Sequence, residues 1–163
     1  MENQPYSSST PHESSSDDHS LGMWMHLGPL LAILLNVFIP IPFLSLIVAV
    51  GLYYMYRDKS TFARANGIES INFQITLTIL GFAILIISMF FFGGSMISML
   101  MGSTTGNEAA SGAGVMGMVG TGIIVGVVYF LIMLVAIILM IVGSVRANNG
   151  SVYRYPFSFR FMK

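Results

Sequence analysis

The chain has 163 residues, of which 55% are hydrophobic and 9% charged, and its formal net charge is zero. Soluble domains carry about a quarter charged residues, so this chain has too few charges to cover a globular surface in water. Zero net charge gives no support to nucleic-acid binding, and the lack of cysteine excludes disulfides, thiolate metal sites and a cysteine nucleophile. The composition predicts an integral membrane protein whose main partner is the lipid bilayer, with no nucleic acid.

Residues 1–20 are rich in serine, contain four acidic residues and have almost nothing to bury. We expect a disordered acidic tail, because ordering it would cost entropy without compensating burial. The segment contains no Lys or Arg, so a cleavable secretory signal is not expected, and the first apolar run should remain in the mature protein.

Residues 21–56 are nearly all apolar but are interrupted by Pro40 and Pro42. One continuous helix over this stretch would be about 54 Å long, against a hydrocarbon core of about 30 Å. Proline removes a backbone donor and biases the preceding residue away from helix. We therefore predict a short proline-broken hairpin with arms at residues 21–38 and 42–56, the second arm being short. A single crossing is the alternative.

Residues 57–74 form the only long polar passage between two apolar regions. Three of the seven cations lie here, and we expect them to face lipid headgroups: Arg57, Lys59 and Arg64. Asn66 and Glu69 have the spacing of a capping box, which predicts a helix that begins at Asn66 and leads into the third span.

The third and fourth spans are predicted at residues 72–101 and 115–145, separated by a small polar loop that we expect to be flexible and exposed. Gly122 and Gly126 form a GxxxG pattern, which favours close helix packing against another span or another copy. The fold class is therefore an all-α integral membrane protein, with residues 21–163 forming one domain of four transmembrane helices.

The last residues alternate aromatic and other side chains with a period of two, from Tyr153 to Phe161. This period is typical of an extended segment with one apolar face, and Pro156 disfavours a central strand. We expect an extended aromatic C-terminal segment along the membrane interface, with its rings inward and its cations toward the headgroups.

The cations fall into two clusters, one in residues 57–64 and one in residues 146–163. Two spans separate them, so both can face the cytoplasm, and the end of the third and fourth spans that carries no Lys or Arg then lies outside. With four spans both termini are cytoplasmic in a multi-pass protein of the inner (plasma) membrane. A three-span alternative puts the N-terminus outside, but the length of residues 21–56 and the two prolines favour four.

No motif for catalysis, phosphate binding or a metal site is present, so we expect no enzyme, no cofactor and no metal. His26 has two interpretations: a pH or ligand sensor, or an imidazole hydrogen-bonded to a neighbouring helix, which we favour. Glu69 is either a helix cap or an ion-pair partner. The candidate structural or partner contacts are Glu69, Asn72, Phe73, Gln74, Tyr153, Arg154, Tyr155, Pro156 and Arg160.

Several of these residues resemble a known family. The stretch MWMHLGPL at residues 23–30 and the proline-broken hairpin resemble the Tic-twenty-like family of small bacterial membrane proteins, and the resemblance covers about residues 21–163. The positions that match the family pattern are Glu69, Asn72, Phe73 and Gln74, together with Gly150, Tyr153, Tyr155, Pro156 and Arg160. Asn66 and Ile68 stand where that family has histidine and lysine. The resemblance implies four helices with both termini cytoplasmic, and little about function.

Two functional hypotheses follow. The first is a non-catalytic scaffold or a subunit associated with protein translocation, whose partners are other membrane proteins or further copies of itself. The second is a small channel, carrier or lipid-handling protein, which needs a polar cavity lined by residues such as Asn36, Asn72, Thr76 and Ser88.

Overall fold

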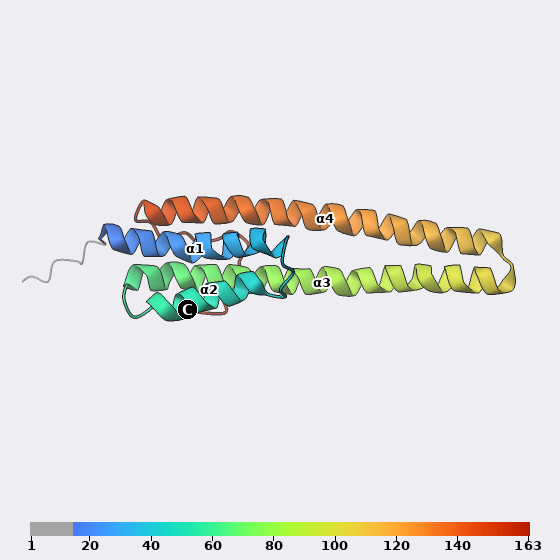
Figure 1. Ribbon diagram of the computed structural model, residues 1–163, viewed down its shortest axis with the longest axis horizontal. Helices are drawn as coiled ribbons and strands as arrows, with labels where there is room; N and C mark the ends of the chain where they lie inside the picture. The colour runs from blue at the N-terminus through green and yellow to red at the C-terminus, as the bar shows by residue number, and fades with distance from the viewer. Residues whose placement is uncertain (1–14) are drawn as a thin grey trace, which may run out of the picture.

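The computed structural model describes residues 15–163, and these form four α-helices. α1 spans Ser16–Asn36, α2 spans Leu44–Tyr56, α3 spans Thr61–Thr105 and α4 spans Glu108–Asn148. α3 and α4 form one long antiparallel hairpin, and the short α1–α2 pair packs against only one half of it (Figure 1). We call the end that holds Ser16, Thr61 and Asn148 the base, and the α3–α4 turn at residues 102–114 the tip.

α3 and α4 are long and apolar enough to cross a membrane. At 1.5 Å per residue, the 45 residues of α3 extend about 68 Å, roughly twice the hydrocarbon core. No residue is buried in the most hydrophobic 18-residue stretch of α3, whose mean hydropathy is 2.6. Such an exposed apolar surface is what a lipid environment accepts and water does not.

α2 has 13 residues and extends about 20 Å, which is too short to cross a core of about 30 Å. Its far end lies beside the middle of α3, because the ring of Phe43 stacks on that of Phe82 at 5.9 Å. Roughly 35 Å of α3 continue beyond this level to Thr105. The all-helical class with four helices is confirmed, whereas four full membrane spans are not.

α1 begins earlier than expected because Ser15 and Asp18 form a capping box. The Asp18 amide donates to Ser15 Oγ at 3.3 Å, and the Ser15 amide donates to Asp18 Oδ2 at 3.1 Å. Residues 16–20, predicted to belong to the disordered tail, are therefore helical. The rest of that predicted tail, residues 1–14, lies outside the described residues.

The predicted cap at Asn66 is wrong. α3 begins one and a half turns earlier, where Ser60 Oγ accepts a hydrogen bond from the Ala63 amide at 3.1 Å. Asn66 is an interior position of α3 with a fully buried side chain. Serine and asparagine are both common helix caps. Ser60 takes this role here, because the Asn66 side chain bonds instead with His26 and Tyr153.

The corrected start of α3 gives a direct test. Replacing Ser60 with alanine should lower the free energy of unfolding by about 1 kcal/mol, because it removes the cap. The Glu69→Ala variant, which a cap at Asn66 would make equally costly, should stay within about 0.5 kcal/mol. Thermal unfolding in detergent measures both, and a larger loss in Glu69→Ala than in Ser60→Ala would restore the Asn66 cap.

Most of residues 102–114 are exposed, as predicted, but the predicted loop is wrong, because the two helices continue through most of it. Gly106 closes α3 with a positive φ of 68°, and Asn107 opens α4 by accepting the Ala110 amide at 3.1 Å. Gly102, Gly114 and Gly117 are the contact points at the tip, since a Cβ there would overlap Ser111, Met99 and Ser95 of the facing helix. Gly122 and Gly126 face open space instead.

Candidate functional site

The residues at the base form a buried polar cluster around His26 of α1. The two ring nitrogens of His26 are both bonded: Nδ1 lies 2.7 Å from the Tyr155 hydroxyl and Nε2 lies 3.0 Å from Asn66 Oδ1. His26 and Asn66 are completely buried, and Tyr155 is 6% exposed. The cluster thus joins α1, α3 and the C-terminal segment, which we define as residues 151–163.

Neighbouring bonds set the direction of each hydrogen bond. Asn66 Nδ2 donates to the Phe62 carbonyl at 3.1 Å, and Asn66 Oδ1 accepts the Tyr153 amide at 3.4 Å. Because Asn66 Oδ1 is an acceptor, His26 Nε2 carries the proton, and Nδ1 accepts from the Tyr155 hydroxyl. Burial, and to a lesser degree Tyr153 and Glu69, raises the pKa of Tyr155 well above its usual value, so the phenol keeps the donated proton.

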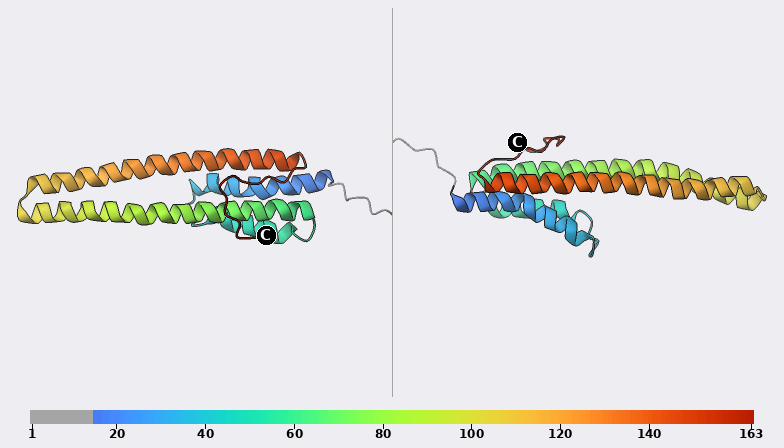
Figure 2. Two further views of the ribbon diagram at one scale, coloured as in Figure 1. Left: turned by 180° about the vertical axis from the view of Figure 1, so that it is seen from behind. Right: turned by 90° about the horizontal axis from the view of Figure 1, so that it is seen from above.

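The C-terminal segment crosses the face of the α3–α4 hairpin opposite to α1 and α2 (Figure 2). The Tyr155 ring enters between α3 and α4 and stacks on Phe73 at 4.0 Å, with the two planes 4° apart. Gly143 of α4 provides the opening, because a Cβ there would lie 3.0–3.2 Å from Tyr153, Tyr155 and His26. Tyr155 thereby reaches His26 on the far side of the long hairpin.

Farther along the segment, side chains of α3 pair with its backbone. Asn72 Oδ1 accepts the amides of Phe161 and Met162 at 3.0 and 2.8 Å, and Asn72 Nδ2 donates to the Met162 carbonyl at 3.0 Å. Thr76 Oγ1 accepts the Phe159 amide at 3.0 Å. A segment without secondary structure needs such partners, because unpaired backbone groups are costly. We call these contacts, with the His26 cluster, the C-terminal clamp.

The clamp can hold a segment in place, but it leaves little room for chemistry. Both nitrogens of His26 are occupied by protein groups. Within residues 15–163 no group of three or more His, Asp or Glu side chains is placed to hold a metal ion. The favoured interpretation of His26, an imidazole bonded to a neighbouring helix, is confirmed by its bond to Asn66.

The structure brings together four of the predicted contact residues: Asn72, Phe73, Tyr153 and Tyr155. Gln74 is buried but faces away from the segment and donates to Met140 Sδ at 3.3 Å. Glu69 is half-buried and makes no ion pair with another described residue, whereas Arg57 and Asp58 form one at 3.4 Å. Three predicted contacts lie exposed on the segment: Arg154, Pro156 and Arg160.

The predicted inward face of aromatic rings is only partly observed. Tyr155 is buried, but Phe157 is 95% exposed, and Phe159 and Phe161 are also exposed. The chain turns at Pro156 and Phe157, where Phe157 has a positive φ of 66°, and this turn interrupts the period of two. The rings after the turn therefore face outward.

The three cations predicted to face lipid lie at the α2–α3 connection and the start of α3. Arg57 stands over the ring of Tyr54 at 4.7 Å, and Lys59 over that of Tyr56 at 5.0 Å. Arg64 is exposed. Cations beside tyrosine rings at a helix end match the composition of a membrane interface.

The polar cavity required by the channel hypothesis does not form as predicted. Asn36 and Ser88 line a crevice at the middle of the long hairpin, whereas Asn72 and Thr76 are part of the C-terminal clamp. The pairing of His26 with Asn66 was not predicted. His26 gave a signal, because it lies in an apolar run and a buried polar group there needs a partner on another helix, but Asn66 lies in the polar passage and gave none.

The family model described as the magnetosome magnetite crystal formation protein family, MamF/MmsF, matches residues 17–162. No curated protein and no solved structure matches the chain.

The match overturns the resemblance to the Tic-twenty-like family, which was drawn over about residues 21–163 from the proline-broken hairpin and from short stretches at residues 23–30, 63–74 and 150–163. A model that covers all four helices and most of the C-terminal segment outweighs those stretches. The chain belongs to the MamF/MmsF family of magnetosome magnetite crystal formation proteins.

Proposed function

We propose that this protein works without catalysis in the membrane that encloses a forming magnetite crystal, as a scaffold that positions other components. The observation that carries the proposal is the family match over residues 17–162, together with the two long apolar helices. The C-terminal clamp adds support, because its buried polar side chains are occupied in holding the C-terminal segment against the helices.

In the proposed arrangement α3 and α4 cross the membrane, and the α1–α2 pair enters from the base and stops partway. The cations Arg57, Lys59, Arg64 and Arg146 lie at the base, which we therefore assign to the cytoplasm together with both termini. The tip carries hydroxyl groups and Glu108 and faces the opposite side, where the crystal would form.

The contact surface for partners is the outward side of the C-terminal segment. Phe157, Phe159 and Arg160 are exposed there, close in sequence to exposed Arg154. Aromatic and arginine side chains are enriched where proteins bind each other. Asn72 and Phe73, by contrast, are buried beneath the segment and unavailable to a partner.

Deleting the gene in its host tests the proposal, with the size and number of magnetite crystals measured by electron microscopy. We expect altered crystals that recover when the wild-type gene is restored. The double variant Arg154→Ala/Arg160→Ala should restore membrane insertion but not crystal size, because it alters only the contact surface. Unchanged crystals in the deletion strain would contradict the role in crystal formation.

A further inference from the structure

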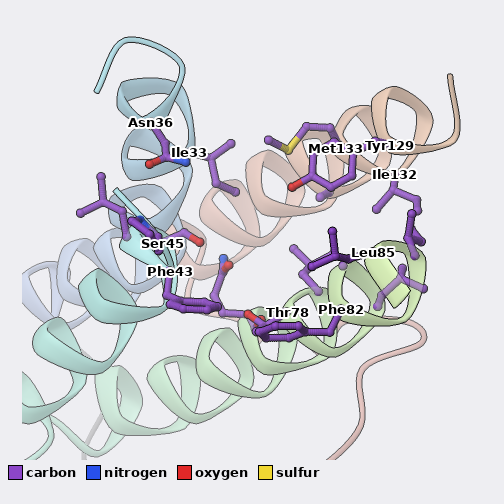
Figure 3. Close-up of a pocket in the computed structure, with 18 of the residues that line it drawn as sticks. Ile33, Asn36, Phe43, Ser45, Thr78, Phe82, Leu85, Tyr129, Ile132 and Met133 are labelled. Atoms are coloured by element: carbon purple, nitrogen blue, oxygen red, sulfur yellow. The ribbon is translucent and has the colours of Figure 1, made fainter. Parts of the chain in front are cut away.

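A crevice of about 600 Å³ lies where the α1–α2 pair ends against the long hairpin. Side chains from all four helices line it, among them Ile33, Phe43, Thr78, Phe82, Tyr129 and Met133 (Figure 3). Its volume is in the range of about 300–1,000 Å³ that is usual for sites of small ligands. The crevice adjoins the core around Tyr155 and Phe73, since Ile33 and Ala136 belong to both, but no hydrogen-bonding residue of the C-terminal clamp lines it.

Most polar side chains that line the crevice are hydrogen-bonded within the protein. Asn36 Oδ1 accepts the Ile41 amide at 2.7 Å, and the Thr78 hydroxyl donates to the Gln74 carbonyl at 2.8 Å. The Ser88 hydroxyl donates to the Ile84 carbonyl. The Ser45 and Tyr129 hydroxyls also line the crevice, but the rest of the lining is hydrocarbon or already hydrogen-bonded, so the crevice favours an apolar occupant.

The mouth of the crevice is continuous with the apolar surface of α3 and α4. Phe82, Leu85 and Tyr129 line the crevice and are each about half exposed on that surface. In a membrane, lipid chains cover this surface. An apolar space open to lipid does not hold ordered water, because water there lacks hydrogen-bond partners.

We propose that the crevice holds one acyl chain of a membrane phospholipid. The chain lies beneath the end of the α1–α2 pair, between the stacked rings of Phe43 and Phe82 and the side chains of α4. The acyl chain supplies van der Waals contacts that the α1–α2 pair lacks on this side. These contacts stabilise the packing of the pair against the α3–α4 hairpin.

Two glycines of α3 allow a matched test. Gly81 lines the crevice and Gly93 lies outside it, and a Cβ at either position meets nothing within 4 Å. Leucine at Gly81 occupies the space of the acyl chain, whereas leucine at Gly93 adds the same surface elsewhere on the helix. Neither change forces the protein to move, so both variants should fold.

The purified wild type, Gly81→Leu and Gly93→Leu are each exposed to dioleoylphosphatidylcholine in detergent, and bound lipid is counted by native mass spectrometry. We expect one lipid on the wild type and on Gly93→Leu, and about tenfold less on Gly81→Leu, equal to about 1.4 kcal/mol. A parallel titration with oleic acid shows whether the bound acyl chain belongs to a phospholipid or to a free fatty acid.

The proposal is overturned if the wild type holds no lipid, if Gly81→Leu binds as much as the wild type, or if Gly93→Leu loses as much as Gly81→Leu. It is also overturned if oleic acid binds and the phospholipid does not, or if the wild type forms a lipid-free dimer that Gly81→Leu abolishes. Because no crystal is measured, these results stand apart from the test of the role in crystal formation.

Discussion

Replacing Tyr155 with alanine is expected to lower the free energy of unfolding by about 3–5 kcal/mol, the usual loss for a large buried aromatic residue. Tyr155 is nearly buried, stacks on Phe73 at 4.0 Å and donates to His26 at 2.7 Å. Its removal opens a cavity between α3 and α4 and leaves a buried His26 nitrogen without a partner. Thermal unfolding in detergent measures the loss, and limited proteolysis should show faster cleavage of the C-terminal segment.

Phe157→Ala is the matched control, because Phe157 is an aromatic residue of the same segment but is 95% exposed. It should change the stability by less than about 0.5 kcal/mol. Tyr155→Phe keeps the ring stack and removes only the hydroxyl, so about 1–3 kcal/mol of the loss should remain. Equal effects of Tyr155→Ala and Phe157→Ala would show that the clamp does not hold the segment.

Replacing Gly114 with leucine is expected to force α3 and α4 apart at the tip. A Cβ at Gly114 would overlap the backbone of Met99 and lie 2.6 Å from the Ser95 carbonyl oxygen. Backbone cannot move aside as a flexible side chain can, so the loss should reach or exceed the 1–3 kcal/mol of ordinary overpacking. The unfolding temperature in detergent should fall, and a disulfide between cysteines placed across the tip should form more slowly.

The Gly122→Leu variant provides the comparison within the same helix. Gly122 belongs to the GxxxG pattern, yet a Cβ there meets nothing within 4 Å. The protomer should therefore tolerate leucine, and the gain in helix propensity is slightly favourable. If Gly114→Leu were harmless, the described tip packing would be wrong. Loss of a dimer in Gly122→Leu would assign the pattern to contacts between copies.

Much of the secondary structure could be predicted, because apolar runs with helical length are a strong signal. The boundaries could not. Ser60 and Asn66 are equally good caps by residue type, and only the bonds of Asn66 to His26 and Tyr153 show that Asn66 lies inside α3. At the tip, the small polar residues have the composition of a loop, but close packing of glycines on the facing backbone keeps them helical.

For the candidate site, too, local features could be predicted from the sequence and long-range pairings could not. The period of two predicted an extended C-terminal segment, and the polar residues entering α3 were identified as contacts. That Asn72 pairs with the backbone of Met162, and His26 with Tyr155, depends on how distant parts of the chain fold together. The false family resemblance used some of the same residues, including Asn72, Phe73 and Tyr155. Short stretches of packing residues do not separate one family from another.

In the proposed arrangement, α3 and α4 cross the membrane while the base and both ends of the described chain stay on one side. Because the chain has no cysteine, Ser16→Cys, Ser103→Cys and Ser151→Cys each give a single labelling site, and all three positions are exposed. A membrane-impermeant maleimide applied to the outside of intact, oriented vesicles measures their sides. We expect Ser16→Cys and Ser151→Cys to react from one side and Ser103→Cys only from the other. Labelling of all three from the same side would contradict it.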